Sequence, residues 1–185
     1  CSTALLVATC WLFPIIAWLI RREDGGPVFF SQVRTGLDGR SFNLFKFRSM
    51  RTDAEGDGEA RWTRTHDSRV TRIGAFLRRA NLDELPQLYN VLRGDMSLVG
   101  PRPHAVAHNH LYQVKIIEYM LRHKVKPGIT GWAQINGYRG ETDTVEKIEK
   151  RVEYDLDYIE RWSVWFDIYI LARTIPALLL NKDVY

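Results

Sequence analysis

Two adjacent acidic side chains, Asp83 and Glu84, are the strongest candidates for chemistry in this chain, because basic residues flank them on both sides. A carboxylate can attack a phosphoryl group and form a covalent intermediate. If a helix begins at Asp83, the N–H groups and dipole of its first turn would stabilise an incoming phosphate. Glu84 offers the hard oxygen ligand that Mg²⁺ prefers. The simpler alternative is a helix N-cap followed by a first-turn acid.

Cationic side chains near this pair could neutralise phosphate charge, since the guanidinium of arginine binds two oxygens and keeps its charge. Arg78 precedes the pair, and Lys46 and Arg48 belong to an expected strand before it. Arg102 lies between two prolines, the second being Pro103, so its backbone direction is fixed in advance. All five residues are candidates for substrate binding. The alternative for each cation is a solvated surface position or a contact with a lipid headgroup.

Metal ligands other than oxygen are not favoured. His104 and His108 have the spacing of a zinc-binding helix pair, but Ala105 stands where such a helix carries its general-base Glu. The acidic segment 53–58 imitates the start of a calcium loop whose final Glu is missing. The sequence therefore predicts Mg²⁺, held through Glu84.

The acidic pair is predicted to lie at the start of a helix from Asn81 to Gly94. Leu85, Leu88 and Leu92 fall on one face at helical spacing, and Asp83 is the expected N-cap. Glycine is the typical residue at a helix end.

A small β-hairpin is expected before this helix, with a turn at Asp38–Gly39 and a return strand over Ser41–Phe47. The polar segment 51–69 is predicted to be a loop. After the Gly-Pro-Arg-Pro connector, His104 to Lys124 is predicted to be helical.

The N-terminal 20 residues carry no charge, and about 20 apolar residues suffice for a straight helix to cross a bilayer. Pro14 should kink or break that helix, and Arg21–Arg22 prefer the cytoplasmic side. Either a spanning helix or a re-entrant helix fits this pattern. A signal peptide is disfavoured, because no positive n-region or cleavage site is visible. The chain begins at Cys1 rather than Met, so we expect it to be part of a longer protein.

The last long stretch is amphipathic, with apolar residues at helical spacing from Val145 to Tyr169 and an aromatic group around Trp162 and Trp165. This pattern suits a helix in a membrane interface, with an ordinary core helix as the alternative. Asp155 in this stretch is a candidate to support the metal or a sugar. Its alternative is an exposed acid on an amphipathic helix.

Together these segments predict an α+β, mainly helical fold with two parts: a membrane-embedded, re-entrant segment 1–22 and a cytosol-facing domain 23–185. A length of 185 residues fits one domain with an appended element. The net charge of +4 favours anionic partners. The 2 cysteines, Cys1 and Cys10, both lie in the apolar N-terminal stretch, which argues against a disulfide framework.

Three sequence blocks, in this order, resemble one family: Lys46–Met50, Leu77–Pro103 and Val125–Thr144. The family is that of the bacterial sugar transferases, also called monotopic phosphoglycosyl transferases. Its Asp-Glu-Leu-Pro-Gln and Gly-Pro-Arg-Pro blocks are highly specific. Within the family, segments 104–109 and 136–142 are most similar to the undecaprenyl-phosphate glucose phosphotransferases of colanic-acid type.

The resemblance implies a two-step reaction at the bacterial inner membrane, with the catalytic domain facing the cytoplasm. Asp83 would attack the sugar-bearing phosphate of a UDP-sugar and release UMP, and undecaprenyl phosphate would then accept the hexose-1-phosphate. Glucose is the expected sugar, although galactose and N-acetylated hexoses also occur in the family. Arg78 and Arg102 are implied for the diphosphate, and Glu84 for the metal. Exopolysaccharide or O-antigen synthesis is the expected pathway.

Other classes of function fit less well. A nucleic-acid-binding protein would arrange its cations in a patch with interleaved aromatic residues, whereas here they surround an acidic pair and follow an apolar anchor. A non-catalytic membrane scaffold would not need Asp83 and Glu84. An ordinary glycosyltransferase would release UDP rather than UMP. A homo-oligomer is possible on any of these hypotheses.

Overall fold

The computed structural model describes residues 2–52, 67–104, 112, 116, 118–139 and 144–180. These residues form a mixed fold of helices and small sheets, which confirms the α+β, mainly helical class. The helices are α1 (Ser2–Thr9), α2 (Leu12–Asp24), α3 (Arg72–Arg79), α4 (Gln87–Arg93), α6 (Trp132–Ile135), α7 (Val145–Glu160) and α8 (Val164–Leu180). The strands are β1 (Phe29–Thr35), β2 (Ser41–Phe47), β3 (Ser97–Val99) and β4 (Gly128–Thr130), and short 3₁₀ helices cover η1 (Leu37–Gly39), η2 (Leu82–Glu84) and η3 (Tyr119–Lys124).

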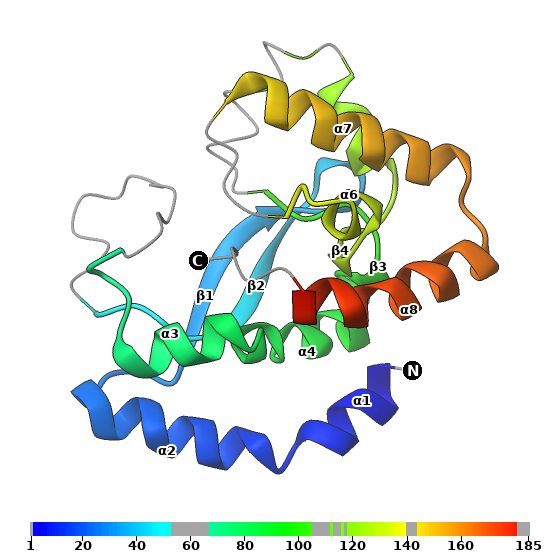
Figure 1. Ribbon diagram of the computed structural model, residues 1–185. Helices are drawn as coiled ribbons and strands as arrows, with labels where there is room; N and C mark the ends of the chain where they lie inside the picture. The colour runs from blue at the N-terminus through cyan, green and yellow to red at the C-terminus, as the bar shows by residue number, and fades with distance from the viewer. Residues whose placement is uncertain are drawn as a thin grey trace.

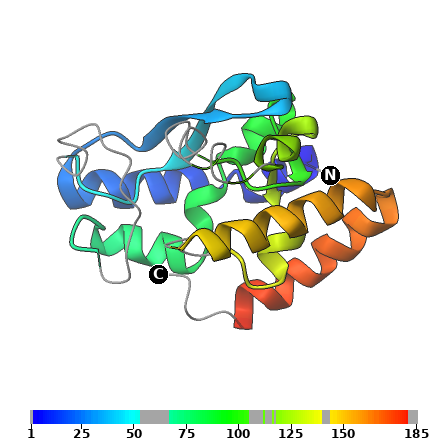
Figure 2. The same ribbon diagram turned by 90° about the horizontal axis from the view of Figure 1, so that it is seen from above.

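The elements are stacked from one edge of the molecule to the other. The pair α1–α2 forms one edge, α3 and α4 lie next to it, the strands occupy the middle, and α7 lies on the far side (Figure 1). Helices α7 and α8 fold back on each other (Figure 2). The helical spacing from Val145 to Tyr169 is present in the structure, but Arg161–Ser163 divide this stretch into two helices. The hydroxyl of Ser163 accepts a hydrogen bond from the N–H of Phe166 and so starts α8 afresh.

The apolar N-terminal segment is bent. Helices α1 and α2 meet at Cys10 and Trp11 with their axes 57° apart. The cause is Pro14, which lacks an N–H and whose ring clashes with the carbonyl four residues earlier, that of Cys10. The Cys10 carbonyl instead accepts a 3.2 Å hydrogen bond from the N–H of Phe13. The predicted interruption by proline is therefore confirmed, one turn before the proline itself.

The described part of the chain contains no single helix with the length and apolarity to cross a membrane, whereas α1 and α2 together meet both criteria. Helix α2 packs one face onto the protein, with Ile16 and Ile20 buried against Phe47 and Leu77. Helix α1 exposes apolar side chains instead, among them Leu5 at 46% and Val7 at 67%.

The expected β-hairpin is present. Strands β1 and β2 pair antiparallel from Phe29 opposite Phe47 to Thr35 opposite Ser41. Its turn places Asp38 and Gly39 at φ 51° and 76°, a left-handed conformation that these residue types tolerate. Because Phe47 at the end of β2 is buried against α2, the hairpin also fixes the position of Lys46, the residue before it.

The helix expected over Asn81–Gly94 is broken into two pieces. The 3₁₀ turn η2 comes first, and α4 begins only at Gln87, with Pro86 as its N-cap. Proline has no N–H to donate to the carbonyl of Leu82, so a continuous α-helix through this point would lack a hydrogen bond. The predicted role of Asp83 as an N-cap is therefore wrong, since Asp83 lies inside η2. The predicted end at Gly94 is confirmed.

Strands β3 and β4 form a short parallel pair in which backbone packs directly on backbone. A Cβ atom at Gly128 would lie 2.1 Å from the nitrogen of Gly100, and one at Gly131 would lie 2.2 Å from the Gly100 oxygen. Only glycine allows such an approach. These contacts hold the connector 100–103 against the segment that leads into α6.

The structure describes only part of two predicted segments. Within 104–124, the last six residues form η3, a 3₁₀ helix rather than the predicted α-helix. Most of the predicted loop 51–69 and His108 lie outside the described residues.

Candidate active site

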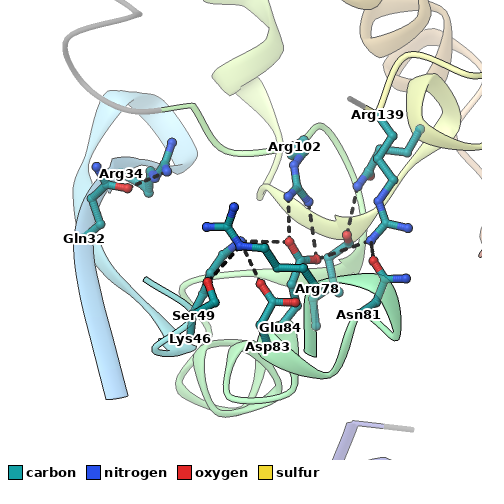
Figure 3. A network of polar contacts seen from close by, with 12 residues as sticks. Gln32, Arg34, Lys46, Ser49, Arg78, Asn81, Asp83, Glu84, Arg102 and Arg139 are labelled. Carbon is teal, nitrogen blue, oxygen red and sulfur yellow. Dashed lines mark hydrogen bonds and ion pairs between the residues drawn. The ribbon is translucent and has the colours of Figure 1, made fainter. Parts of the chain in front are cut away.

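Asp83 and Glu84 lie on η2, in the middle of a group of basic side chains that come from distant parts of the chain (Figure 3). Both acids are only 7% exposed. Lys46 reaches them from β2, Arg78 from α3, and Arg102 from the connector after β3. These three predicted substrate-binding residues are thus brought together around the pair.

Glu84 is the acid that the cations hold. Arg102 donates from Nη2 to Glu84 Oε1 at 2.6 Å, and Lys46 donates from Nζ to the same oxygen at 2.9 Å. Arg139 approaches the other oxygen, with Nη2 3.7 Å from Oε2. Burial alone would raise the pKa of Glu84, but Arg102 and Lys46 outweigh it and hold that pKa well below its usual range. Glu84 is therefore ionised, and its Oε1 already accepts hydrogen bonds from Arg102 and Lys46.

Asp83 is less engaged by the protein. Its closest ion pair places Oδ2 4.0 Å from Lys46 Nζ, too far for a hydrogen bond. Burial raises the pKa of Asp83, and the positive charge of Lys46 partly opposes that rise. A buried carboxylate near cations, yet not closely paired, is suited to meet an external phosphorus atom.

Arg78 is positioned by an unusually close approach of α3 to the segment after β2. A Cβ atom at Gly74 would lie only 2.0 Å from the carbonyl oxygen of Ser49, so this contact requires glycine. Arg78 then donates from Nε to the Ser49 hydroxyl at 2.8 Å. Its guanidinium is thereby fixed beside Asp83.

Two residues of this site escaped the sequence analysis. Asn81 adopts a left-handed backbone conformation, φ 55°, just before η2, and its side-chain oxygen accepts a hydrogen bond from Arg139. Asparagine is one of the few residue types that tolerate this conformation. A signal for Arg139 existed, since it stands in the third sequence block, but no local pattern connects it with Asp83.

Two predicted binding residues lie away from the acidic pair. Arg48 donates to both carboxylate oxygens of Asp24, at the end of α2, and to the carbonyl of Pro27 at 2.5 Å. Asp155 is buried in α7, where its Oδ2 lies 2.6 Å from Arg122 Nη2. Pro103 is half-buried next to Arg102.

A second cluster of polar side chains holds the connector 100–103 through the backbone of Arg102. Arg122 donates to the backbone carbonyl of Arg102 at 2.8 Å, which links Asp155 indirectly to the site. His104 Nδ1 lies 2.6 Å from the hydroxyl of Tyr119 and 2.7 Å from Arg122 Nη1, and its Nε2 lies 3.1 Å from Arg151 Nη1. Both ring nitrogens of His104 thus face protein groups.

The described residues contain no group of three or more His, Cys, Asp or Glu side chains placed to hold a metal ion. Mg²⁺, however, needs only one or two carboxylates when substrate phosphates and water complete its shell. Glu84, the predicted ligand, fits that requirement through Oε2, because the contacts of this oxygen with Arg102 Nη1 at 3.4 Å and Arg139 Nη2 at 3.7 Å are longer than those of Oε1.

An acidic pair surrounded by lysine and arginine defines a site for phosphorylated substrates, with a carboxylate able to act as nucleophile. The chain belongs to the bacterial sugar transferase family, whose model matches residues 1–181.

Similar proteins point to the same chemistry. The chain is 55% identical over 184 residues to the UDP-glucose:undecaprenyl-phosphate glucose-1-phosphate transferase of Escherichia coli K12, an alignment that covers 100% of this chain and 39% of that protein. It is 49% identical over 185 residues to a Caulobacter vibrioides protein of the same name, covering 100% of this chain and 69% of that one. It is 44% identical over 164 residues to an Aeromonas hydrophila UDP-N-acetylgalactosamine-undecaprenyl-phosphate N-acetylgalactosaminephosphotransferase, covering 88% and 38%. The chain thus spans about two fifths of the length of the Escherichia coli relative.

Proposed function

We propose that this chain is the catalytic part of a phosphoglycosyl transferase that moves glucose-1-phosphate from UDP-glucose to undecaprenyl phosphate. The observation that carries the proposal is the unequal state of the two acids. Glu84 makes short ion pairs with Arg102 and Lys46. In contrast, Asp83 Oδ2 lies 4.0 Å from Lys46 Nζ and makes no short ion pair. The names of the relatives supply the sugar and the lipid acceptor.

In the first step, an Asp83 oxygen attacks the sugar-bearing phosphorus of UDP-glucose. The bond between that phosphorus and the bridging oxygen breaks, and UMP leaves with the electron pair. Lys46, Arg78 and Arg102 bind the diphosphate and the developing charge on UMP. Glu84 keeps Lys46 and Arg102 in place through its two short contacts.

In the second step, a phosphate oxygen of undecaprenyl phosphate attacks the phosphorus of the Asp83 acyl phosphate. The Asp83 carboxylate is released, and a diphosphate-linked lipid is formed. Mg²⁺, when bound at Glu84, would supply additional neutralisation of phosphate charge.

The experiment that tests this proposal is intact-mass measurement after incubation with UDP-glucose alone. Wild-type protein should gain the mass of a hexose phosphate and release one equivalent of UMP. Asp83→Asn should gain no mass and release no UMP, while Asp38→Asn, in the hairpin turn at 57% side-chain exposure, should behave as wild type. Sequential kinetics with no mass adduct would contradict the covalent route, and release of UDP would indicate an ordinary glycosyltransferase.

The sugar is tested by a panel of UDP-sugars with detection of UMP. Glucose should give the largest kcat/KM, in line with the names of the Escherichia coli and Caulobacter relatives. The Aeromonas relative makes UDP-N-acetylgalactosamine the main competitor, and a higher kcat/KM for it would overturn the glucose assignment. EDTA should abolish UMP release, and added Mg²⁺ should restore it.

We also propose that residues 1–22 anchor the enzyme in the bacterial inner membrane as a re-entrant segment, with residues 23–185 on the cytoplasmic side. The bend at Cys10–Trp11 and the exposed apolar side chains of α1 support this topology. Such an arrangement would bring Asp83 level with the phosphate of a membrane lipid, while UDP-glucose arrives from the cytoplasm.

A further inference from the structure

An apolar cavity of about 200 Å³ lies beside the acidic pair, between helices from the two ends of the described chain. Helix α1 lines it with Leu5 and Thr9, one turn apart, and α8 lines it with Thr174, Ala177 and Leu178. Its floor comes from other elements: Leu88 of α4, Ile129 of β4 and Ile135 of α6. The two helices that wall the cavity are thus the apolar segments of the molecule.

The lining of the cavity includes both surface and active-site residues. Leu5, which is 46% exposed beside other exposed apolar side chains of α1, lines it, and so do Asn81, Glu84 and Arg139. A ligand that fills it would therefore carry an apolar tail and end in a polar group next to η2.

The charge around the acidic pair as a whole favours an anion, because four cations, Lys46, Arg78, Arg102 and Arg139, surround the two acids. Arg139 lies on the opposite side of Glu84 from Lys46 and Ser49 (Figure 3). Arg139 is held there by the side-chain oxygen of Asn81 and by Glu84 Oε2 at 3.7 Å. The acidic pair thus has one cationic side formed by Lys46 and Arg78 and another formed by Arg139.

We infer that this cavity binds the first isoprene units of the polyprenyl phosphate acceptor and that Arg139 binds its phosphate. The inference rests on the proposed function and adds where the lipid lies. Lys46 and Arg78 would hold the nucleotide diphosphate, and Arg139 would hold the lipid phosphate. The lipid phosphate attacks in line with the bond from Asp83 to phosphorus, at the position that UMP has left, so the two anions bind in succession.

The size of the cavity fits part of the lipid only. A cavity of about 150 Å³ accepts a molecule the size of benzene, so 200 Å³ holds about one or two five-carbon isoprene units. The rest of a long polyprenyl chain must leave past Leu5 and the exposed face of α1. The cavity therefore accommodates the start of the polyprenyl chain and not its full length.

The test fills the cavity with larger side chains at Ala177, a lining residue of α8. Ala177→Trp places a large ring in the cavity, and Ala177→Leu fills it partly. Ala172→Trp is the matched control, because Ala172 lies on the same helix but is exposed. For each variant of the full-length protein in detergent, two quantities are measured: the burst of UMP with UDP-glucose alone, and the KM for undecaprenyl phosphate.

We expect Ala177→Trp to raise the KM for undecaprenyl phosphate at least tenfold, and Ala177→Leu to raise it less, while the UMP burst persists. Ala172→Trp should change neither quantity more than twofold. An intact burst with an unchanged lipid KM in Ala177→Trp would overturn this inference alone. Absence of a burst in the wild type would instead overturn the proposed function.

A second measurement covers the case in which Ala177→Trp does not fold. Wild-type protein is irradiated with a benzophenone-bearing farnesyl phosphate, and the labelled peptides are identified by mass spectrometry. Cross-links within 5–9 or 174–178, competed by undecaprenyl phosphate but not by dioleoyl phosphatidic acid, would support the inference. Cross-links confined to other segments, or equal competition by phosphatidic acid, would overturn it.

Discussion

Arg102 Nη2 lies 2.6 Å from Oε1 of Glu84, and this contact separates the roles of two adjacent acids. Glu84 and Asp83 are equally buried, but only Glu84 has short contacts with the cations. Removing Arg102 would leave the buried charge of Glu84 with less compensation, and an uncompensated buried charge lowers the free energy of unfolding. The contact therefore contributes to stability as well as to the placement of Arg102.

We expect Arg102→Met to lower the free energy of unfolding by about 2 kcal/mol, less than the ~3–5 kcal/mol of a fully broken buried pair, because Lys46 and Arg139 remain near Glu84. For a domain of this size the melting temperature should fall by about 4–8 °C. Glu84→Gln added to Arg102→Met should recover part of the loss, as for any coupled pair.

The control for this measurement is Arg93→Met. Arg93 pairs with Asp95 at 3.4 Å, but its side chain is 48% exposed. Exposed ion pairs contribute about 0–1 kcal/mol, so the melting temperature should change little. Equal effects of the two substitutions, or strict additivity with Glu84→Gln, would refute the structural role of the Arg102–Glu84 contact.

Replacing Lys46 with Met should shift the pH dependence of UMP release. Asp83 must be ionised to attack, so the burst rate falls as the pH drops through its pKa. Burial raises this pKa and the charge of Lys46 lowers it. Loss of Lys46 should therefore move the acid limb of the burst rate to higher pH, measured by quenched flow without lipid. Lys46→Arg should move it less, and an unchanged or lower midpoint in Lys46→Met would contradict the assignment of Asp83.

Substitutions at Asn81 should separate backbone conformation from the contact with Arg139. Asn81→Gly and Asn81→Ala both remove the acceptor for Arg139, and both should reduce kcat/KM for the lipid acceptor. Only Ala is strained at φ 55°, so Asn81→Ala should be about 1 kcal/mol less stable than Asn81→Gly. Thermal unfolding and steady-state kinetics measure the two effects. Full activity in Asn81→Gly would show that the Arg139 contact is dispensable.

Pro14→Leu should straighten the N-terminal segment, because leucine supplies the N–H that an α-helix directs to the Cys10 carbonyl, which now accepts from Phe13 instead. A continuous helix over Ser2–Asp24 would be about 34 Å long at 1.5 Å per residue, enough to cross a bilayer. In a background without Cys1 and Cys10, a cysteine at Thr3 should resist a membrane-impermeant thiol reagent in intact cells. Pro14→Leu should make that cysteine reactive.

Pro176→Leu is the control for the topology experiment, because Pro176 lies inside α8 and should leave Thr3 protected. Labelling of Thr3→Cys in intact cells without any change at Pro14 would mean that the segment spans the membrane, and the re-entrant proposal would be wrong.

Local features of the fold could be predicted because their causes are local. Asp38–Gly39 dictates the hairpin turn, and Pro14 dictates the bend through the carbonyl of Cys10. The leucine spacing predicts a helix from Asn81, but α4 begins only after Pro86, because a proline interrupts the helical hydrogen bonds of the turn before it.

The positions of two site residues depend on contacts between segments that are distant along the chain. Lys46 and Arg48 are two residues apart and would share one face of a regular strand. Strand β2 ends at Phe47, however, so Arg48 leaves that face and binds Asp24. Arg139 reaches Glu84 only because the segment before it packs on the connector, a contact that no periodicity reveals.

The glycine contacts between β3 and β4 also have a consequence for turnover. Because Gly100 touches Gly128 and Gly131 without intervening side chains, the start of the connector with Arg102 is packed directly on the segment that leads to Arg139. We expect these two backbone segments to move together. We therefore expect substrates to exchange by rotation of side chains, on a picosecond-to-nanosecond scale where they are exposed, instead of by the slower opening of a lid. The rate-limiting event would then be the arrival of the lipid or the chemical step, and solvent viscosity should have little influence on UMP release.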